Sequence, residues 1–594
     1  MSLIRTHTCG ELTQANTGEN VILNGWVDTR RDLGGVIFID LRDRYGLTQV
    51  VFSPQDNAEA HELADQLRPE FAIGIEGAVK ERSEENVNRK LKTGEVEIRV
   101  HKLQIYSRAK TPPFEIKDDV KTNEDVRLKY RYLDLRRPSM QKNLMLRSKV
   151  YQSTRNYFYK HDFAEVETPV LMRSTPEGAR DYLVPSRVNA GKFFALPQSP
   201  QTYKQLLMVS GMDRYFQIVK CFRDEDLRAD RQPEFTQIDV ELSFTDEEQI
   251  YSLSEGLMQA ILKETLDVDI QAPFKRMTYP DAISTYGSDK PDTRFDLKFV
   301  DFSDIVEKSD FRVFSKTVND GGSVIGFVVP GMGTLGRGVM DRLTKRVQDE
   351  LGAGGLIYMK NNADELYSSV SKFVKEETSR EMVERSGAKE GDLILLLAGP
   401  SPKVYHQLGD LRLIVAKEYE LIDTRKHDFL WVTDFPLLEF DPEEGRYFAM
   451  HHPFTSPQID DLSKMEDSPG DIKARAYDLV YNGNEIGGGS IRIHQRELQQ
   501  QMFRLLGIDD EEAQQKFGFL LDAFQYGPPP HGGIALGLDR VVMLLAGSKN
   551  LREVIAFPKN QKAQSIMDNS PDEVDPKQLD ELHIQLKPRI NAKA

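Results

Sequence analysis

Two arginine-bearing segments constrain the fold and chemistry of this chain more than any other feature. One is FRDEDLRADRQPEF at 222–235, and the other is GIALGLDR at 533–540. The first is predicted to be a charged loop between two alternating strands, and the second to open an apolar helix. Arginines on a loop and at a helix start favour a polyphosphate site. The alternatives are a solvated hairpin tip and a buried helix.

Length and composition limit the class of protein. A chain of 594 residues is too long for one core and predicts roughly three or four domains. Hydrophobic residues at 39% and charged residues at 29% are typical of a soluble globular protein, and no apolar run could span a bilayer. The first residues lack the pattern of a signal or transit peptide, so we expect a cytoplasmic location without a membrane partner. Cys9 and Cys221 alone exclude a disulfide framework or a cysteine-rich zinc site.

Charge is unevenly distributed along the chain. The formal net charge of -16 would repel nucleic acid, so any such binding must use local patches. Residues 121–149 hold nine Lys and Arg against three Asp and Glu, centred on RLKYRYLDLRRP. This segment is interpreted as a basic linker, with a solvated helical surface as the alternative.

The order of predicted elements indicates an α+β multidomain protein. Five short strands within 1–108 predict an OB-type β-barrel. A helix is expected at 139–160, a strand pair at 215–244 and a helix at 247–265. The strands GLIYMK and DLILLLAG belong to a separate α/β insertion. The predicted division is 1–108 (barrel), 109–138 (hinge), 139–289 (first part of an antiparallel-sheet core with helices), 290–420 (inserted α/β domain), 421–558 (second part of the core) and 559–594 (C-terminal extension).

The first hairpin combines an aromatic ring with carboxylates. Strand alternation places Phe235, Gln237, Asp239 and Glu241 on one face beside the arginine-rich loop. Phe235 could stack a base, Arg223 could hold a phosphate and Asp239 could pair with an ammonium group. A solvated polar face is the alternative, although an exposed Phe235 fits it poorly.

A second hairpin is predicted at YDLVYNGNEIGGGSIRIH. The Asn482-Gly483 turn pairs Val480 with Glu485, and Asp478 shares the face of Val480. Two carboxylates on one surface would suit Mg²⁺ bridging phosphates. Regular alternation turns Arg492 to the opposite face, unless the glycine run after Glu485 supplies a β-bulge.

These motifs resemble the aspartyl-tRNA synthetases of the bacterial type, in subclass b of the class II synthetases, over nearly the whole chain. The helix and strand ending at Pro169 resemble motif 1, residues 222–244 motif 2, and GIALGLDR motif 3. The segments ALPQSPQTYKQLLM, HHPFTSP and GGGSIRIH narrow the resemblance to the aspartyl enzymes. It implies an anticodon-binding barrel, the bacterial-type insertion, and a homodimer formed through the motif 1 helix.

The resemblance implies an aspartate–tRNA ligase, which forms aspartyl-adenylate from aspartate and ATP and transfers aspartate to the 3′ end of tRNA-Asp. Positioning and charge neutralisation dominate such chemistry, so no general base is expected. Arg223, Arg540 and Glu485 are the implied catalytic residues. The implied ATP contacts are Arg223, Asp224, Glu225, Gln232, Phe235, Glu485, Gly537, Leu538, Asp539 and Arg540, with Phe235 and Arg540 enclosing the adenine. Asp478 and Glu485 would hold Mg²⁺.

The same resemblance assigns the amino-acid and anticodon sites. The implied aspartate contacts are Glu177, Ser199, Gln201, Lys204, Arg223, Asp239, His451 and Arg492. For His451 and its neighbour His452, metal binding or plain packing is the alternative. Arg31, Phe38 and Gln49 match anticodon-contacting positions, although Phe38 could instead belong to the barrel core. Leu33 stands where enzymes that charge both tRNA-Asp and tRNA-Asn often have histidine, which favours tRNA-Asp alone.

Several other functions remain open. An enzyme that also charges tRNA-Asn is one alternative, and a non-catalytic RNA-binding relative is another. A lysyl enzyme would want an acid at Arg492, and an asparaginyl enzyme would have little use for Lys204. An ammonia-using asparagine synthetase would lack the barrel at 1–108.

Overall fold

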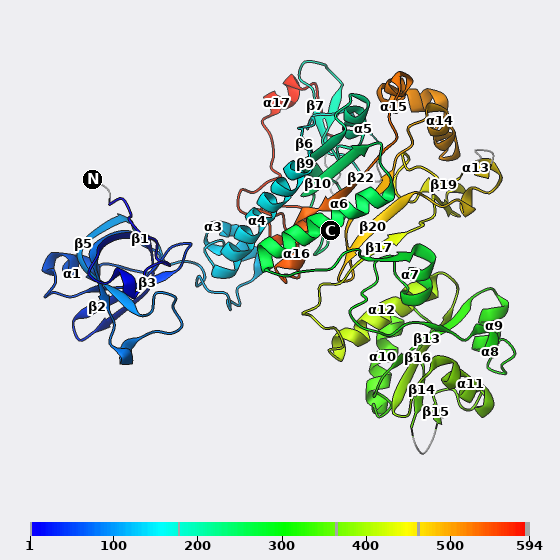
Figure 1. Ribbon diagram of the computed structural model, residues 1–594, viewed down its shortest axis with the longest axis horizontal. Coiled ribbons are helices and arrows are strands. Elements are labelled where there is room, and N and C mark those ends of the chain that lie inside the picture. Colours follow the sequence, from blue (N-terminus) through cyan, green and yellow to red (C-terminus); the bar gives the residue numbers. More distant parts are fainter. Residues whose placement is uncertain (1–2, 176–178, 363–365, 460–463, 588–594) are drawn as a thin grey trace. The chain divides into compact units, whose positions relative to one another are not determined.

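The computed structural model describes residues 3–175, 179–362, 366–459 and 464–587 (Figure 1). It contains two compact units. Unit 1 comprises Met1–Arg147, Leu227–Ala229 and Asn550–Glu573, and unit 2 comprises the remainder of the chain. The six-segment division made from the sequence stays a prediction.

The N-terminal part of unit 1 is a closed five-stranded barrel, as predicted. Its strands follow the order β1-β2-β3-β5-β4, with bounds β1 (Asn20–Leu33), β2 (Val36–Arg42), β3 (Leu47–Phe52), β4 (Ala72–Glu81) and β5 (Val96–Ser107). Alternate residues such as Ile37 and Ile39 fill the interior with α1 (Ala58–Asp65) packed against β5. Their neighbours therefore face outwards.

The remainder of unit 1 contains the basic linker. It forms α2 (Glu124–Lys129), α3 (Arg131–Asp134) and the start of α4 (Pro138–Lys160), and η5 (Leu551–Glu553) belongs to the same unit. Helix α4 begins one residue before its predicted start. The alternative of a solvated helical surface is wrong for Arg131 and Arg137, which are 3% and 9% exposed.

An eight-stranded sheet is the centre of unit 2. Its order is β11-β17-β20-β21-β22-β10-β9-β6, and only the β11–β17 and β6–β9 pairs are parallel. The strands are β6 (Ala164–Glu165), β9 (Arg214–Phe222), β10 (Glu234–Ser243), β11 (Lys275–Thr278), β17 (Phe429–Thr433), β20 (Ala476–Tyr481), β21 (Asn484–Ile491) and β22 (His531–Gly537). Residues from the two predicted core segments therefore share one sheet.

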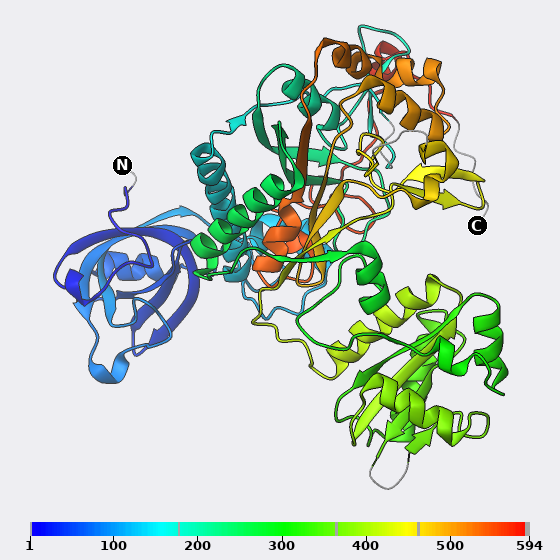
Figure 2. The same cartoon turned by 45° about the vertical axis from the view of Figure 1, so that its right-hand side comes forward.

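Helices pack on this sheet around its central strands. Helix α16 (Leu538–Leu545) contacts β10, β21 and β22, α6 (Glu247–Leu266) contacts β22, and α5 (Gln201–Val209) contacts β9 and β10 (Figures 1 and 2). The expectation that GIALGLDR opens a helix is correct only for its end, because residues 533–537 form the last part of β22. At Gly533 a Cβ atom would lie 2.3 Å from the Glu241 carboxylate on the adjacent strand, which explains the glycine.

The insertion has a sheet of its own, as predicted. Five strands run in the order β12-β13-β16-β14-β15: β12 (Val300–Asp301), β13 (Ser323–Val329), β14 (Ile357–Asn361), β15 (Leu366–Ser368) and β16 (Asp392–Gly399). Two hydrophobic clusters cover the sheet. The helices of this region are α8 (Ser303–Val306), α9 (Arg312–Asn319), α10 (Arg337–Asp349), α11 (Glu376–Ser386) and α12 (Lys403–Glu418).

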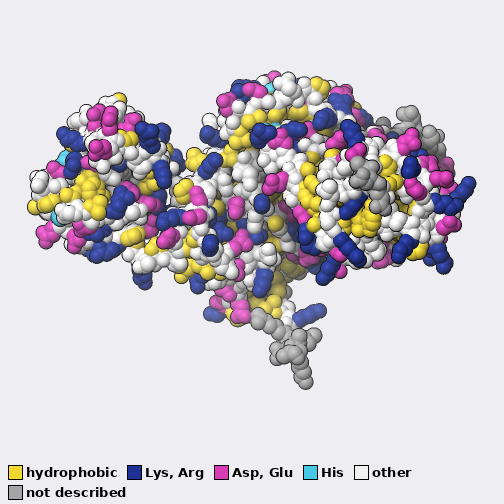
Figure 3. Space-filling view, turned by 90° about the horizontal axis from the view of Figure 1, so that it is seen from below, with side chains coloured by type: hydrophobic (Ala, Val, Ile, Leu, Met, Phe, Trp, Pro, Cys, Tyr) yellow, Lys and Arg dark blue, Asp and Glu magenta, His cyan; other side chains and the backbone are white. Residues whose placement is uncertain are grey.

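Smaller elements complete unit 2. They are β7 (Leu183–Pro185), β8 (Phe193–Ala195), α7 (Tyr279–Tyr286), β18 (Leu438–Asp441), β19 (Arg446–Ala449), α13 (Lys464–Asp467), α14 (Arg496–Leu505), α15 (Asp510–Ala523) and α17 (Pro576–Glu581). No helix among the described residues is long and apolar enough to cross a membrane. Acidic and basic side chains are interspersed over the face in Figure 3.

Candidate active site

A buried cluster of four charged side chains joins α5, β10 and the residue that follows β21. Lys204 of α5 contacts Asp239 at 2.7 Å and Glu241 at 3.4 Å, both on β10. Arg492, just after β21, donates from Nε to Glu241 Oε1 over 3.0 Å. All four are at most 5% exposed. Burying charges is costly unless they are paired, so each one must be satisfied within the cluster or by a ligand.

Arg492 keeps part of its hydrogen-bonding capacity. Glu241 accepts from its Nε and Nη2 atoms, and the Ser490 hydroxyl accepts from Nη1 at 2.7 Å. A guanidinium has five N–H donors. Within the described part of the chain two donors therefore remain, on Nη1 and Nη2. Glu241 fixes the plane of the guanidinium and leaves its outer edge for a carboxylate ligand.

Asp239 has an oxygen without a partner. Its Oδ1 atom accepts from Lys204, whereas Oδ2 is buried and has no hydrogen-bond partner among the described residues. Burial raises the pKa of Asp239, and the charge of Lys204 opposes that rise only in part. The charges of Arg492 and Lys204 outweigh burial at Glu241 and lower its pKa. An ammonium ligand at Oδ2 would stabilise the carboxylate form of Asp239.

The second hairpin has the predicted register. Tyr481 pairs with Asn484 and Val480 with Glu485, while Asn482 and Gly483 have φ values of 50° and 74°. The next pair is Leu479 with Gly487, which leaves Ile486 as a β-bulge. The bulge therefore lies one residue before the glycine run. With this bulge, Glu485, Gly488 and Arg492 lie on the face of Asp478. The β-bulge that Arg492 needs in order to reach this face is therefore present.

Asp478 and Glu485 form a carboxylate pair on this face. The negative charge of Asp478 is the main cause of the raised pKa of Glu485, and burial adds to it. Arg540 donates to the Glu485 carbonyl at 2.6 Å and pairs with Asp230 at 3.4 Å. Two adjacent carboxylates that repel each other are a site that a divalent cation would stabilise. The described residues contain no group of three metal-ligating side chains. A cation at this pair would therefore also need oxygen atoms from a bound ligand.

The two adjacent histidines have different surroundings. His451 Nε2 lies 3.8 Å from Asp478, and the interaction with Asp478 outweighs burial and raises the pKa of His451. Burial and the charge of Arg492 lower the pKa of His452 well below its usual value. His451 therefore lies beside Asp478, whereas the charge of Arg492 acts on His452.

The loop between β9 and β10 presents the first arginine segment. The Arg223 guanidinium lies over the Phe235 ring, 5.1 Å from its centroid, and has no carboxylate partner among the described residues. Glu225 pairs with Arg231 at 2.9 Å, and Gln232 is buried. The Asp224 amide donates to the Arg180 carbonyl. Arg223 and Phe235 thus form a half-buried cation and ring surface that suits a nucleotide.

The third motif supplies both an anchor and a cation. Asp539 in the first turn of α16 accepts from the Thr236 amide at 2.6 Å, which ties the helix to β10. Gly537 ends β22 and Leu538 is fully buried. Arg540 is left partly exposed, with 28% of its side-chain surface accessible.

The remaining candidate pocket residues have mixed outcomes. Gln201 is buried and donates to Gln205 at 3.2 Å, and Ser199 is half-buried two residues earlier. Glu177 lies outside the described residues. Glu241 was not predicted to be a site residue, although strand alternation places it on the face of Asp239. The only sequence signal for Glu241 is a second carboxylate two residues after Asp239 on the same strand. A solvent-exposed strand would show the same pattern.

On the barrel, the anticodon candidates share the outer face. Arg31 pairs with Phe38 across β1 and β2, and Asp40 pairs with Gln49 across β2 and β3. Arg31 contacts Asp40 at 2.8 Å and donates to Gln49 at 3.3 Å. Phe38 is half-buried and lies outside the barrel core, so the core alternative is wrong for it. Leu33 is 62% exposed at the end of β1.

Comparisons with known proteins agree with this architecture. Residues 123–561 match the family "tRNA synthetases class II (D, K and N)", and residues 21–106 match "OB-fold nucleic acid binding domain". The "Aspartate–tRNA(Asp/Asn) ligase" of Salinibacter ruber is 58% identical over 98% of this chain and 94% of its own. The "Aspartate–tRNA ligase" of Oceanobacillus iheyensis is 54% identical, over 97% and 98%. Asparaginyl-tRNA synthetase of Pyrococcus horikoshii, solved with asparaginyl-adenylate, has a similar fold with a TM-score of 0.60 at 20% identity, covering 94% of this chain and 98% of its own.

Proposed function

The chain belongs to the class II tRNA synthetases of the D, K and N type, as an aspartate–tRNA ligase, and from this premise we propose how its residues divide the reaction. The buried four-charge cluster carries the proposal. Lys204 and the outer edge of Arg492 bind the side-chain carboxylate of aspartate. The Oδ2 atom of Asp239 accepts from the substrate ammonium, with Glu177, Ser199 and Gln201 completing the pocket and His451 closing over it. Glu241 orients Arg492.

ATP, the second substrate, occupies the adjoining surface. Phe235 and Arg540 enclose the adenine, and Arg223 neutralises charge on the α-phosphate as aspartate attacks and pyrophosphate leaves. Arg540 also approaches the γ-phosphate. Asp224, Glu225, Gln232, Gly537, Leu538 and Asp539 complete the nucleotide site.

Mg²⁺ fits the pair formed by Asp478 and Glu485. The ion would neutralise phosphate charge, and its binding would relieve the repulsion that raises the pKa of Glu485. Both carboxylates need a shared face, and the pairing of Val480 with Glu485 puts Glu485 on the face of Asp478.

Pyrophosphate exchange tests the amino-acid assignment. The full chain with ATP, Mg²⁺ and each of aspartate, asparagine and lysine should exchange pyrophosphate into ATP only with aspartate. Exchange of similar rate with asparagine would contradict the assignment of Lys204 and Arg492, and exchange with none would contradict the proposed chemistry.

The position of Gly488 gives a prediction for the Mg²⁺ site. A Cβ atom there would lie 2.4 Å from Asp478 Oδ1, so Gly488→Ala must displace that carboxylate. We expect the Mg²⁺ concentration for half-maximal exchange to rise about 10- to 100-fold. Exchange measured against Mg²⁺ at saturating aspartate checks this, with the KM for aspartate at high Mg²⁺ as the control. An unchanged Mg²⁺ requirement would move the metal site away from Asp478.

The barrel face is proposed to bind the anticodon of tRNA-Asp. Phe38 would stack an unpaired base, with Arg31 and Gln49 beside it. Phe38→Ala should weaken tRNA binding by about 1–3 kcal/mol, seen as a raised KM for tRNA-Asp in charging. Pyrophosphate exchange without tRNA should be unchanged, and an unaltered KM for tRNA would contradict the stacking role.

Charging of tRNA-Asn as well is the second candidate. Relatives of similar identity carry both names, "tRNA(Asp/Asn)" for Salinibacter ruber and "tRNA" alone for Oceanobacillus iheyensis. Leu33 is exposed on the barrel near the proposed anticodon face and favours tRNA-Asp alone. Charging of purified tRNA-Asn relative to tRNA-Asp distinguishes the two.

A second copy of this chain is the proposed partner, through the motif 1 helix α4 together with an apolar patch in unit 2 that directly follows motif 1. Val170, Leu171, Leu183, Phe193 and Phe194 are all exposed. They lie on or beside β7 and β8, which pair with each other, and Met172 bridges to Ala195 of β8. An apolar patch of this kind favours association. A homodimer mass in solution would support this proposal. We also propose that the enzyme is located in the cytoplasm.

A further inference from the structure

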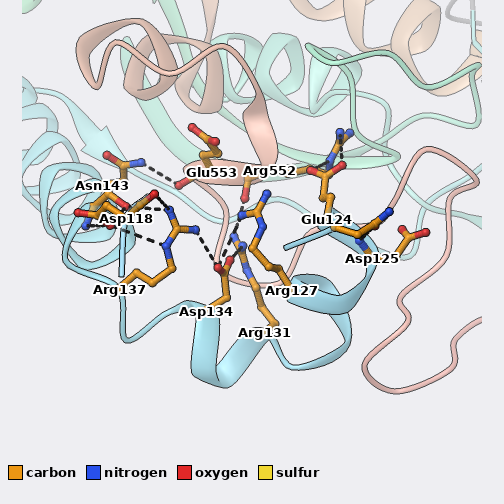
Figure 4. Close-up of polar contacts among 12 residues, drawn as sticks. Asp118, Glu124, Asp125, Arg127, Arg131, Asp134, Arg137, Asn143, Arg552 and Glu553 are labelled. Carbon is orange, nitrogen blue, oxygen red and sulfur yellow. Dashed lines mark hydrogen bonds and ion pairs between the residues drawn. The ribbon is translucent and has the colours of Figure 1, made fainter. Parts of the chain in front are cut away.

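The arginines of the basic linker turn inward around one carboxylate. Asp134 is fully buried and accepts from Arg131 at 2.6 Å and Arg137 at 2.9 Å, with Arg127 at 3.6 Å (Figure 4). One carboxylate cannot neutralise three guanidiniums. Burial of the excess charge requires further acceptors, because an unsatisfied buried cation is strongly destabilising.

Those acceptors are backbone carbonyls of the segment 552–556. Arg131 donates to the carbonyls of Arg552, Ile555 and Ala556, with distances of 2.8 Å to Ile555 and 2.9 Å to Ala556. Asn143 donates to the Glu553 carbonyl at 3.1 Å, and Arg147 donates to that of Val554 at 3.2 Å. Five consecutive carbonyls are thus held by side chains from the linker and the start of α4. Arg131 alone holds three of them.

The same segment contacts the loop between β9 and β10. The Leu551 amide donates to the Ala229 carbonyl at 3.1 Å, and Ala229 belongs to unit 1 with the linker. Asp230 follows directly in the chain and pairs with Arg540. Holding Ala229 in place therefore restrains the loop that has Arg223 at one end and Phe235 at the other.

We propose that Arg131 is a positioning residue for the ATP-binding loop, acting through the segment 551–556 and its bond to Ala229. This inference rests on the proposed function, because the proposed function assigns ATP to that loop. Arg131 touches no substrate. Its role is to fix a segment that has only a short 3₁₀ turn, at Leu551–Glu553, to hold its shape.

Only arginine can make this set of bonds. The planar guanidinium directs Nη1 to Asp134 and its other two nitrogens to three carbonyls at once. Lysine keeps the charge but offers a single ammonium on a flexible stem. Arg131→Lys should therefore loosen the segment 551–556 while keeping the ion pair with Asp134.

Arg137 offers a matched control. It contacts the same carboxylate, but its other hydrogen bonds go to the Asp118 carbonyl and the Ser139 hydroxyl rather than to the segment 552–556. Arg137→Lys should disturb the linker cluster to a similar degree without freeing the segment. Asn143→Leu removes one carbonyl bond and is a milder test that preserves the Asp134 cluster.

The experiment is pyrophosphate exchange by the full chain without tRNA, at varied ATP and at varied aspartate, with thermal unfolding measured for each variant. We expect Arg131→Lys to raise the KM for ATP about tenfold, because the substitution loses about two hydrogen bonds to the segment 552–556. Asn143→Leu should raise the KM for ATP by less. The KM for aspartate should change less than about twofold in both. Arg137→Lys should leave both KM values near those of the unchanged enzyme.

Two results would overturn the proposal. One is an unchanged KM for ATP in Arg131→Lys and Asn143→Leu. The other is equal effects of Arg131→Lys and Arg137→Lys, which would make the cluster a purely structural element. Failure of the proposed function is distinguishable, because the unchanged enzyme would then show no aspartate-dependent exchange.

Discussion

Replacing Arg223 by alanine is expected to lower the rate of aspartate-dependent pyrophosphate exchange by about 10³-fold or more. Removal of a single group that stabilises transition-state charge has effects of this order in other phosphoryl and acyl transfer enzymes. Arg223 lies over the Phe235 ring and has no ion-pair partner among the described residues. Its charge is therefore available to a phosphate ligand, unlike those of Arg492 and Arg540, which already contact acidic groups.

The effect should fall on the chemical step. Because Arg223 holds no carboxylate in the free enzyme, its loss leaves no unpaired buried anion, and we expect thermal unfolding to change little. Arg228→Ala is the matched control, since Arg228 is an exposed arginine of the same loop. The measurement is kcat for exchange together with tRNA affinity, which should be retained. Near-normal exchange in Arg223→Ala would remove this residue from the mechanism.

Local sequence signals predicted the parts of the fold that short-range geometry determines. The Asn482-Gly483 turn correctly predicted the pairing of Val480 with Glu485, because a two-residue turn fixes the register of a hairpin. Alternation likewise predicted the five barrel strands. The bulge was expected in the glycine run but lies at Ile486, a buried residue directly before it.

Contacts between distant parts of the chain were not predictable in the same way. The pairing of Arg492 with Glu241 joins residues 251 positions apart, and nothing near either residue indicates it. The linker arginines were interpreted as a basic surface or linker, yet Arg131 is buried against carbonyls more than 400 residues away. A buried, satisfied charge and a solvated one have the same local sequence, and only the tertiary structure distinguishes them.

Discrimination between aspartate and asparagine should depend on Arg492. The two substrates are nearly equal in size, so charge and hydrogen-bond polarity must separate them. The outer edge of the guanidinium gains charge-assisted bonds of about 1.5–3 kcal/mol each with a carboxylate, whereas the amide group of asparagine presents a donor to a donor. Glu241 and Ser490 accept hydrogen bonds from the guanidinium and hold it in place.

Arg492→Leu is therefore expected to reduce aspartate activation by about 10⁴-fold, the scale seen when a buried polar partner is lost. Arg492→Lys should recover little, because lysine lacks the planar fork. Leucine also leaves Glu241 without its nearer partner, which would destabilise the fold, but Lys204 at 3.4 Å still pairs with that carboxylate. Thermal unfolding and the KM for ATP control for misfolding.

Glu241→Gln separates orientation from recognition. It removes the charge that holds Arg492 in place but keeps the guanidinium, so we expect lower activity with the preference for aspartate retained. The measurement is pyrophosphate exchange with aspartate and with asparagine for all three variants. An Arg492→Leu enzyme that preferred aspartate by its original margin would transfer the specificity role to Lys204, the other cation of the cluster. Loss of the preference in Arg492→Leu but not in Glu241→Gln would place the discrimination on the guanidinium itself.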